Sequence, residues 1–149
     1  MAASTAPSVK AALLTLLAAD TGLAGVQVEY ADPGEAIAQE SMFYGRTIET
    51  ERPDTLGQRA QRETYELELW VYVAQDGNDP QSCEERCWAV VARVESVVRA
   101  NNGPQGSLSA ALSPGSGWVV MGAIEMSPFT ANGQRVAEAL CKISVTAKK

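Results

Sequence analysis

Residues 62–73 constrain the fold of this chain more than any other segment, because apolar and polar residues alternate along them. A period of two is typical of a β-strand with one buried face. The apolar positions of that face are Tyr65, Leu67, Leu69, Val71 and Val73. The opposite face begins with Glu66 and Glu68 and then becomes aromatic at Trp70 and Tyr72. We therefore expect this strand to need a cover on both sides, the second one supplied by another subunit.

Two helices and four further strands can be predicted around this strand from the same kinds of pattern. Residues 82–100 repeat apolar side chains at helical spacing, and either Asp79 before Pro80 or Ser82 with Glu85 would cap that helix. The other predicted elements are a helix at 8–19 and strands at 26–30, 41–48, 118–126 and 134–147. The order α-β-β-β-α-β-β predicts an α+β fold, a mainly antiparallel sheet with two helices on one face, in a single domain of residues 1–149.

The strand at 118–126 is apolar on both faces, with Val119 and Met121 on one and Trp118 and Val120 on the other. Such a strand is expected in the middle of a sheet that is covered on both sides. Asn132-Gly133 predicts a chain reversal after it, somewhat longer than a two-residue turn. Because aromatic residues favour assembly contacts, we place Trp70, Tyr72, Val119 and Met121 together at a subunit boundary.

Composition excludes several functional classes. The chain carries 18 acidic and 12 basic residues, and a net charge of −6 disfavours tight nonspecific binding of nucleic acid. Histidine is absent, which removes the commonest general base and metal ligand. No apolar run reaches the length of a membrane span, and we expect no secretory signal.

The remaining candidate sites have simpler structural interpretations. Cys83, Cys87 and Cys141 are too few for a soft metal site without histidine, so we expect reduced, packed thiols. The segment 76–79 (Asp-Gly-Asn-Asp) is a turn and helix cap rather than a calcium loop, which would need a distal glutamate. The glycine-rich stretches within 103–117 lack the lysine of a phosphate loop. We predict no catalytic residue, no metal and no cofactor.

One long polar connection is a candidate contact region. Residues 49–61 lie between two predicted strands and carry arginines among acids. We predict that Arg52, Arg59 and Arg62 contact a partner protein or a neighbouring subunit, and the alternative is a hairpin tip without a role.

The ordered set of elements resembles the tail terminator proteins of long-tailed (siphovirus-type) phages. The resemblance covers most of the chain and rests on the first helix from Val9 to Ala18, the segment Leu23–Tyr30, the strand Tyr65–Val73, helix 82–100 and the final hairpin. It lies in element order and size, since the family has no invariant motif, and it leaves the loop 101–117 without a family pattern.

This resemblance implies a non-enzymatic virion protein of the tail-neck region, assembled in the host cytoplasm. Known members form six-fold rings that cap the tail tube, end its polymerisation and present a surface to the head-neck connector protein. The implied partners are further copies of the chain, the tail tube protein and the connector, with DNA passing through the channel without specific binding and no contact with a membrane. Two alternatives remain: a tail-completion or head-closure neck protein, and a small α+β ligand-binding module.

Overall fold

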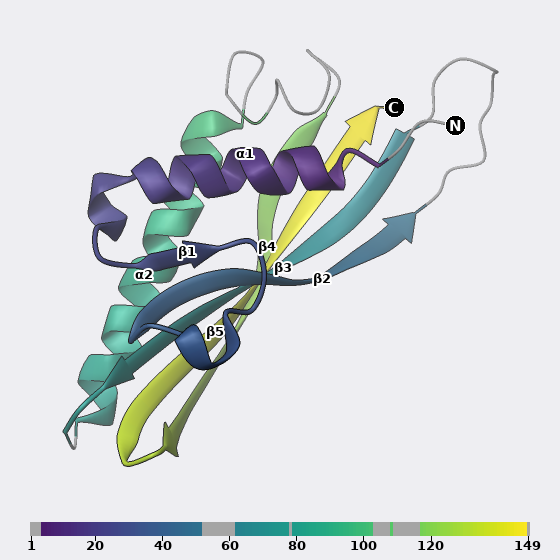
Figure 1. The fold of residues 1–149 in the computed structure, drawn as a ribbon. Helices are drawn as coiled ribbons and strands as arrows, with labels where there is room; N and C mark the ends of the chain where they lie inside the picture. The colour runs from purple at the N-terminus through teal and green to yellow at the C-terminus, as the bar shows by residue number, and fades with distance from the viewer. Residues whose placement is uncertain (1–3, 52–61, 78, 103–107, 109–116, 149) are drawn as a thin grey trace.

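The computed structural model describes residues 4–51, 62–77, 79–102, 108 and 117–148. The described helices are α1 (Ala6–Ala19) and α2 (Pro80–Asn101), with two short 3-10 turns, η1 (Thr21–Leu23) and η2 (Gly34–Ala36). The strands are β1 (Gln27–Glu29), β2 (Glu40–Glu51), β3 (Arg62–Gln75), β4 (Trp118–Ala131) and β5 (Gln134–Lys148). The predicted α-β-β-β-α-β-β order is confirmed (Figure 1).

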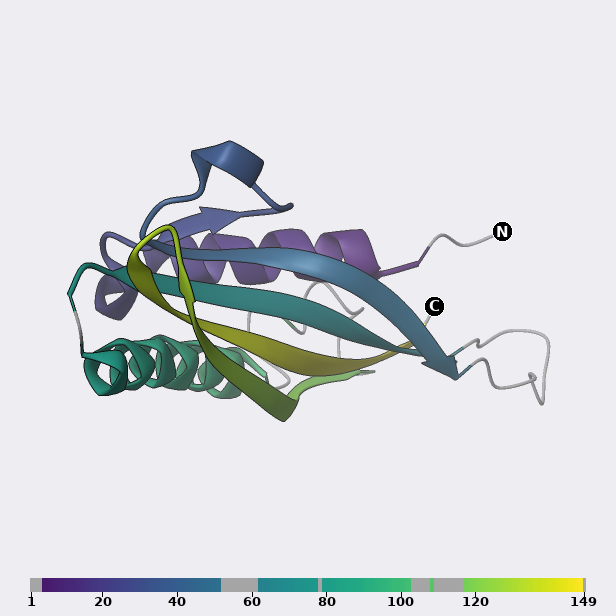
Figure 2. The ribbon, with the colours of Figure 1, turned by 90° about the horizontal axis from the view of Figure 1, so that it is seen from below.

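The strands form one five-stranded sheet in the order β1-β2-β3-β5-β4. Only the β1–β2 pair is parallel among the described pairings, and β2–β3, β3–β5 and β4–β5 are antiparallel. Both helices lie on the same side of this twisted sheet (Figures 1 and 2). The predicted α+β class, with two helices on one face, is therefore confirmed.

The face of the sheet beneath the helices, which we call the inner face, carries the hydrophobic core. Leu67, Leu69 and Val71 of β3 are completely buried there, and Cys141 and Ile143 of β5 lie in register beside Leu69 and Leu67. The helices contribute their own buried stripes: Val9, Leu13 and Leu17 from α1, and Cys87, Val90, Val91, Val94 and Val98 from α2. The alternation of β3 and the helical periodicity of α2 predicted this layer correctly.

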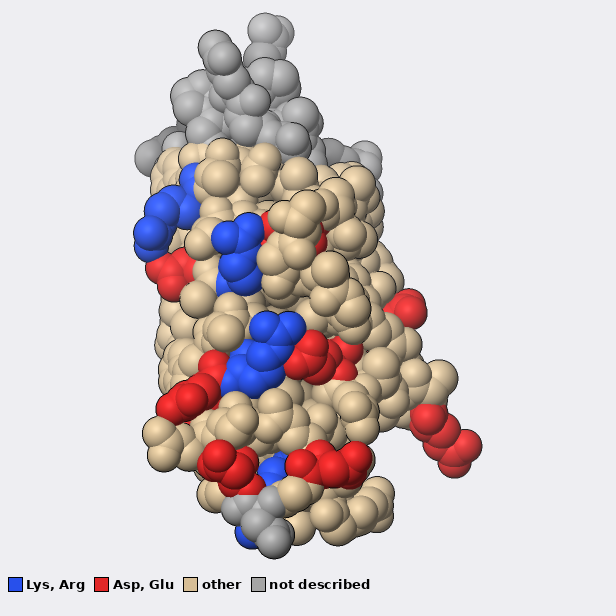
Figure 3. Space-filling model, turned by 90° about the vertical axis from the view of Figure 1, so that its left-hand side faces the viewer, with Lys and Arg blue, Asp and Glu red and all other residues tan. Residues whose placement is uncertain are grey.

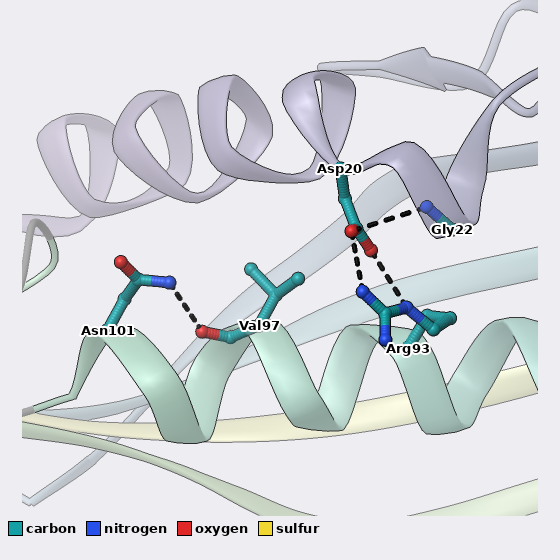
Figure 4. A network of polar contacts seen from close by, with 5 residues as sticks. All are labelled: Asp20, Gly22, Arg93, Val97 and Asn101. Carbon is teal, nitrogen blue, oxygen red and sulfur yellow. Dashed lines mark hydrogen bonds and ion pairs between the residues drawn. The ribbon is translucent and has the colours of Figure 1, made fainter.

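Polar contacts fix the two helices relative to the sheet and to each other. The Asp79 side chain accepts a hydrogen bond from the Ser82 amide (3.1 Å), so the first of the two predicted caps starts α2. Asp20, at the end of α1, accepts two hydrogen bonds from the Arg93 guanidinium of α2, at 2.6 and 3.0 Å (Figure 4). The arginine lowers the pKa of the Asp20 carboxyl, because it favours the ionised form.

The structure corrects three predictions about the last two strands. β4 is an edge strand, whereas its two apolar faces had predicted a central position; β5 lies inside the sheet, between β3 and β4. A β-bulge between Met121 and Ile124 interrupts the period of two. Residues after the bulge therefore point to the face opposite to the one that regular alternation from Trp118 would give. Ala131 pairs with Gln134, and Asn132 and Gly133 both have positive φ angles (51° and 75°), which makes the reversal a tight two-residue turn.

No helix among the described residues is long and apolar enough to cross a membrane. The predicted polar connection begins later than the sequence indicated, because β2 continues to Glu51. Residues 52–61 lie outside the described part of the chain.

Candidate functional site

The sheet face opposite the helices, which we call the outer face, has no helix over it among the described residues (Figure 2). Its central row consists of Phe43, Trp70, Leu140 and Glu125 in direct cross-strand register on β2, β3, β5 and β4. The next row carries Tyr72 between Ser41 and Glu138. Both predicted aromatic residues, Trp70 and Tyr72, therefore lie on this face, and both are half-buried.

The Trp70 ring is held against a bulge in β2. A Cβ atom built on Gly45 would come within 2.7 Å of Trp70 Nε1, so the indole occupies the space that a side chain at position 45 would need. Phe43 and Leu140, its register neighbours, are only 8% exposed although no helix covers them. The centre of the outer face is thus an apolar surface that is already packed within the subunit.

The edge strand β4 carries the most exposed apolar side chains of this face. Among the described residues, three of the five large apolar side chains that are exposed belong to it: Trp118 (48%), Val120 (46%) and Phe129 (41%). Trp118 is in register with Thr146, Val120 with Ser144, and Phe129 with Val136, which places all three on the outer face. Trp118 and Val120 are neighbours on this face and Phe129 lies near the other end of the strand, so exposed apolar area occurs at both ends of β4, and apolar area of this kind can take part in protein contacts.

The structure does not bring the four predicted boundary residues together. Val119 is completely buried and pairs with Val145, and Met121 packs against the same core beneath α2. They lie on the inner face, whereas Trp70 and Tyr72 lie on the outer face. The two apolar faces of β4 have different surroundings: α2 lies over the inner one, and no described helix lies over the outer one.

A row of alternating charges crosses the outer face beside Trp70. Arg46 of β2 donates a hydrogen bond from Nε to Glu68 Oε1 of β3 (2.7 Å), and the Glu68 side chain is only 3% exposed. Glu68 lies directly opposite Lys142 of β5, whose Nζ atom is 3.9 Å from Glu125 Oε2 of β4. The signs therefore read plus, minus, plus, minus from β2 to β4. The side chains at the two ends, Arg46 and Glu125, are 79% and 63% exposed.

The backbone of β4 has limited capacity to pair with a further strand. The Val119 amide points away from β5 and donates to Asn102 Oδ1 at the end of α2 (3.0 Å). Pro128, near the other end, has no amide hydrogen, and a proline in an edge strand directs that missing donor outward. Together with the bulge after Met121, these features restrict ladder formation along this edge.

The three cysteine thiols among the described residues are buried. Burial raises the pKa of the Cys87 and Cys141 thiols to about 12 each, which disfavours the reactive thiolate. Cys83 is also buried, and its thiol donates to the Val73 carbonyl (3.4 Å). Within the described ranges, no group of three or more acidic or thiol side chains is arranged to hold a metal ion.

Two pockets in the described part of the chain are small. One of about 190 Å³ lies between Cys83 and the β4–β5 hairpin, and one of about 130 Å³ lies between the end of α2 and Val119–Met121. Ligand sites usually enclose about 300–1,000 Å³, so neither has the size of a substrate pocket.

Charges of both signs are mixed on the face that Figure 3 displays, where Lys and Arg lie beside Asp and Glu among uncharged residues. That face shows no continuous basic surface for a phosphate backbone. Of the three predicted contact arginines, Arg52 and Arg59 lie outside the described residues, and Arg62 is described only as the first backbone position of β3.

Sequence reasoning missed the charge row and the exposed Phe129. The pairing of Arg46 with Glu68 depends on the bulges that shift β2 against β3 between Tyr44 and Thr47. Placing Glu125 on the outer face requires the bulge in β4. Glycine at positions 45 and 122 was the one available signal, because glycine inside a strand often marks a bulge.

Similarity to known proteins is found at the level of structure. The sequence matches no protein-family model, and no curated protein shows significant similarity to it. The fold is similar to that of a chain in a solved structure described as the virion of a native gene transfer agent particle. The alignment has a TM-score of 0.62 at 16% sequence identity and covers 98% of this chain and 100% of that chain. At this identity the match establishes a shared fold.

Proposed function

We propose that this chain is a structural protein of a phage-like virion, and that within the virion it is the tail terminator. In this role, copies of the chain form a ring on the tail tube, end its polymerisation and present the surface to which the head-neck connector attaches. The observation that carries the proposal is the similarity of fold to a virion chain of the same extent, matched from end to end.

The outer face supports a role in assembly. A subunit that exposes Trp118, Val120 and Phe129 on an edge strand, beside half-buried Trp70 and Tyr72, has a surface suited to protein contact. The net charge of −6 suits a protein through whose ring DNA passes without being bound. A non-enzymatic role agrees with the buried thiols, whose raised pKa disfavours nucleophilic chemistry.

Two other functions remain as alternatives. A tail-completion or head-closure protein of the same neck region would use the same fold and the same outer face. A small-molecule-binding module would need a pocket, and the two described ones, of about 190 and 130 Å³, are below the usual range.

Two measurements separate these functions. Native mass spectrometry of the purified chain should show a ring at micromolar concentration, alone or with the tail tube protein, whereas a binding module would stay monomeric. Electron microscopy of particles assembled without this chain should then show tubes of uncontrolled length. Tubes of normal length that fail to join heads would instead identify a tail-completion or head-closure protein.

The predicted contact made by Arg52, Arg59 and Arg62 is part of the same proposal. If Arg59 and Arg62 contact the tube or the adjacent subunit, their joint reversal to glutamate should weaken attachment in a salt-dependent way and leave the melting temperature of the monomer unchanged. Each exposed ion pair contributes only about 0–1 kcal/mol, so the double variant is needed for a measurable effect. Unchanged assembly and tail length in that variant would remove the loop from the interface.

A further inference from the structure

The alternating charge row ends differently at the two edges of the sheet. At the β2 edge, the Arg46 guanidinium is anchored through Nε to buried Glu68, and within the described residues its two terminal nitrogens have no partner. At the β4 edge, Glu125 has a single long contact, 3.9 Å from Lys142 Nζ. One edge therefore presents a positive group and the other a negative group, both on the outer face.

Both ends of the row lie where the sheet is open. β1 pairs only with Ser41–Phe43, so the part of β2 that contains Arg46 has no described strand on its far side. β4 is the last strand of the described sheet. Among the described residues, the sheet thus has one open edge that presents Arg46 and, at its opposite end, another that presents Glu125.

We propose that a second copy of this chain docks its β4 edge against the open β2 edge of the first copy, with its Glu125 bound by Arg46. This contact continues the plus-minus alternation from one subunit into the next. Because the two surfaces are unlike and lie at opposite ends of the sheet, the contact is heterologous. Its repetition from subunit to subunit can close a ring. The inference rests on the proposed ring-forming function and specifies which surfaces join.

Side chains determine this contact more than backbone pairing does. The Val119 amide is already bonded to Asn102, and Pro128 has no amide to donate, so a long ladder along β4 is not available. The exposed Trp118 and Val120 supply the apolar area beside the charge pair. A planar guanidinium with free terminal nitrogens favours binding to a carboxylate at a defined angle.

The test uses two variants that should be unable to assemble alone but able to assemble with each other. The first is Glu125→Lys, which creates repulsion against Arg46 of the next copy. The second combines Arg46→Glu with Glu68→Gln, so that the new carboxylate does not face a buried one. In an equimolar mixture, every contact between unlike variants restores one opposite-charge pair. Glu35→Lys, at an exposed acid remote from the charge row in the sheet, is the matched control.

Native mass spectrometry and sedimentation velocity at tens of micromolar report the outcome, and circular dichroism reports whether each variant is folded. We expect the parent and Glu35→Lys to assemble, each charge variant to dissociate at least tenfold more readily, and the mixture to recover assemblies of alternating composition. If the parent assembles and folded Glu125→Lys assembles equally well, the contact lies elsewhere and the ring proposal survives. If the parent remains monomeric alone and with the tube protein, both proposals are wrong. Failure of the mixture to assemble, with all variants folded, would also overturn the contact.

Discussion

The two faces of the sheet differ in what completes them. Every large apolar residue that β3 and β5 direct to the inner face is buried at 0–2% exposure, because α1 and α2 lie over it. On the outer face, the exposure of large apolar side chains ranges from 2% at Val136 and 8% at Phe43 and Leu140 to more than 40% at Trp118, Val120 and Phe129. The inner face is completed by the subunit itself, and the outer face retains apolar area for another molecule to cover. Mutations on the inner face should therefore lower the free energy of unfolding, and mutations on the outer face should chiefly affect assembly.

The largest effect is expected on the inner face. Leu69→Ala removes a side chain with no exposed surface and should lower the free energy of unfolding by about 2–5 kcal/mol, through lost burial and the remaining cavity. Denaturant unfolding of the dilute subunit measures this change. A loss below about 1 kcal/mol would mean that the inner face is less tightly packed than its burial indicates.

The next effect is expected on assembly. Trp70→Glu places a charge at the centre of the outer face and should abolish the oligomer while the subunit stays folded. Trp88→Glu is the control, since Trp88 is 42% exposed on α2, away from the outer face. Sedimentation velocity and near-ultraviolet circular dichroism separate the two outcomes. If Trp70→Glu simply unfolds the chain, then Trp70 belongs to the core, and the centre of the outer face is not a surface for another molecule.

A smaller effect concerns the ion pair that joins α2 to the first residue of β2. Arg86 holds the pKa of the Glu40 carboxyl below its ordinary value of 4.5, through two hydrogen bonds of 2.6 and 2.9 Å. A lowered pKa contributes stability above pH 4.5 that is lost as pH falls through the folded-state value. Glu40→Gln should be less stable than the parent at pH 7, by at most about 1 kcal/mol for so exposed a pair, and equal to it in acid. Unfolding curves at pH 7 and in acid test this; a constant difference would contradict it.

The smallest effect has the opposite sign and lies on the outer face. Partial burial, followed by the nearby Asp32 carboxylate, raises the pKa of Glu138 above its ordinary value of 4.5. Ionised Glu138 therefore costs stability at neutral pH, and the cost disappears as pH falls below 4.5. Glu138→Gln should raise the melting temperature slightly at pH 7 and leave it unchanged in acid. A variant that is less stable at pH 7 would show that the carboxylate makes a favourable contact instead.

The inner face was predictable from sequence, and the outer face only in part. The alternation of Tyr65–Val73 and the helical spacing of Cys87–Val98 define which side chains face the core, because burial imposes a fixed period. The same alternation placed Trp70 and Tyr72 on the outer face correctly. Periodicity failed in β4, where the bulge after Met121 changes the face of every later residue.

Strand order was also beyond the reach of local patterns. An apolar strand is expected inside a sheet, yet β4 takes the edge and β5 an interior position, because strand order depends on pairing between distant segments that no local pattern contains. The charge row depends on register between distant segments, and no spacing along the chain reveals it. The features that support the proposed assembly are therefore those that tertiary structure alone provides.

The pairing of β3 with β5 has a consequence for the speed of folding. Arg62 lies opposite Lys148 and Gln75 opposite Arg135, so pairing of β3 with β5 joins segments that are about 60–86 residues apart in the sequence and is complete only when the whole of β5 has been synthesised. Contacts between such distant segments slow folding, because a long loop must close before any contact stabilises it. The tight Asn132-Gly133 turn lets β4 and β5 form a local hairpin first, and this hairpin then adds to β3 as a unit. Until that step, β3 lacks its partner strand along one edge, and an unpaired strand edge of this kind favours aggregation of a newly made subunit.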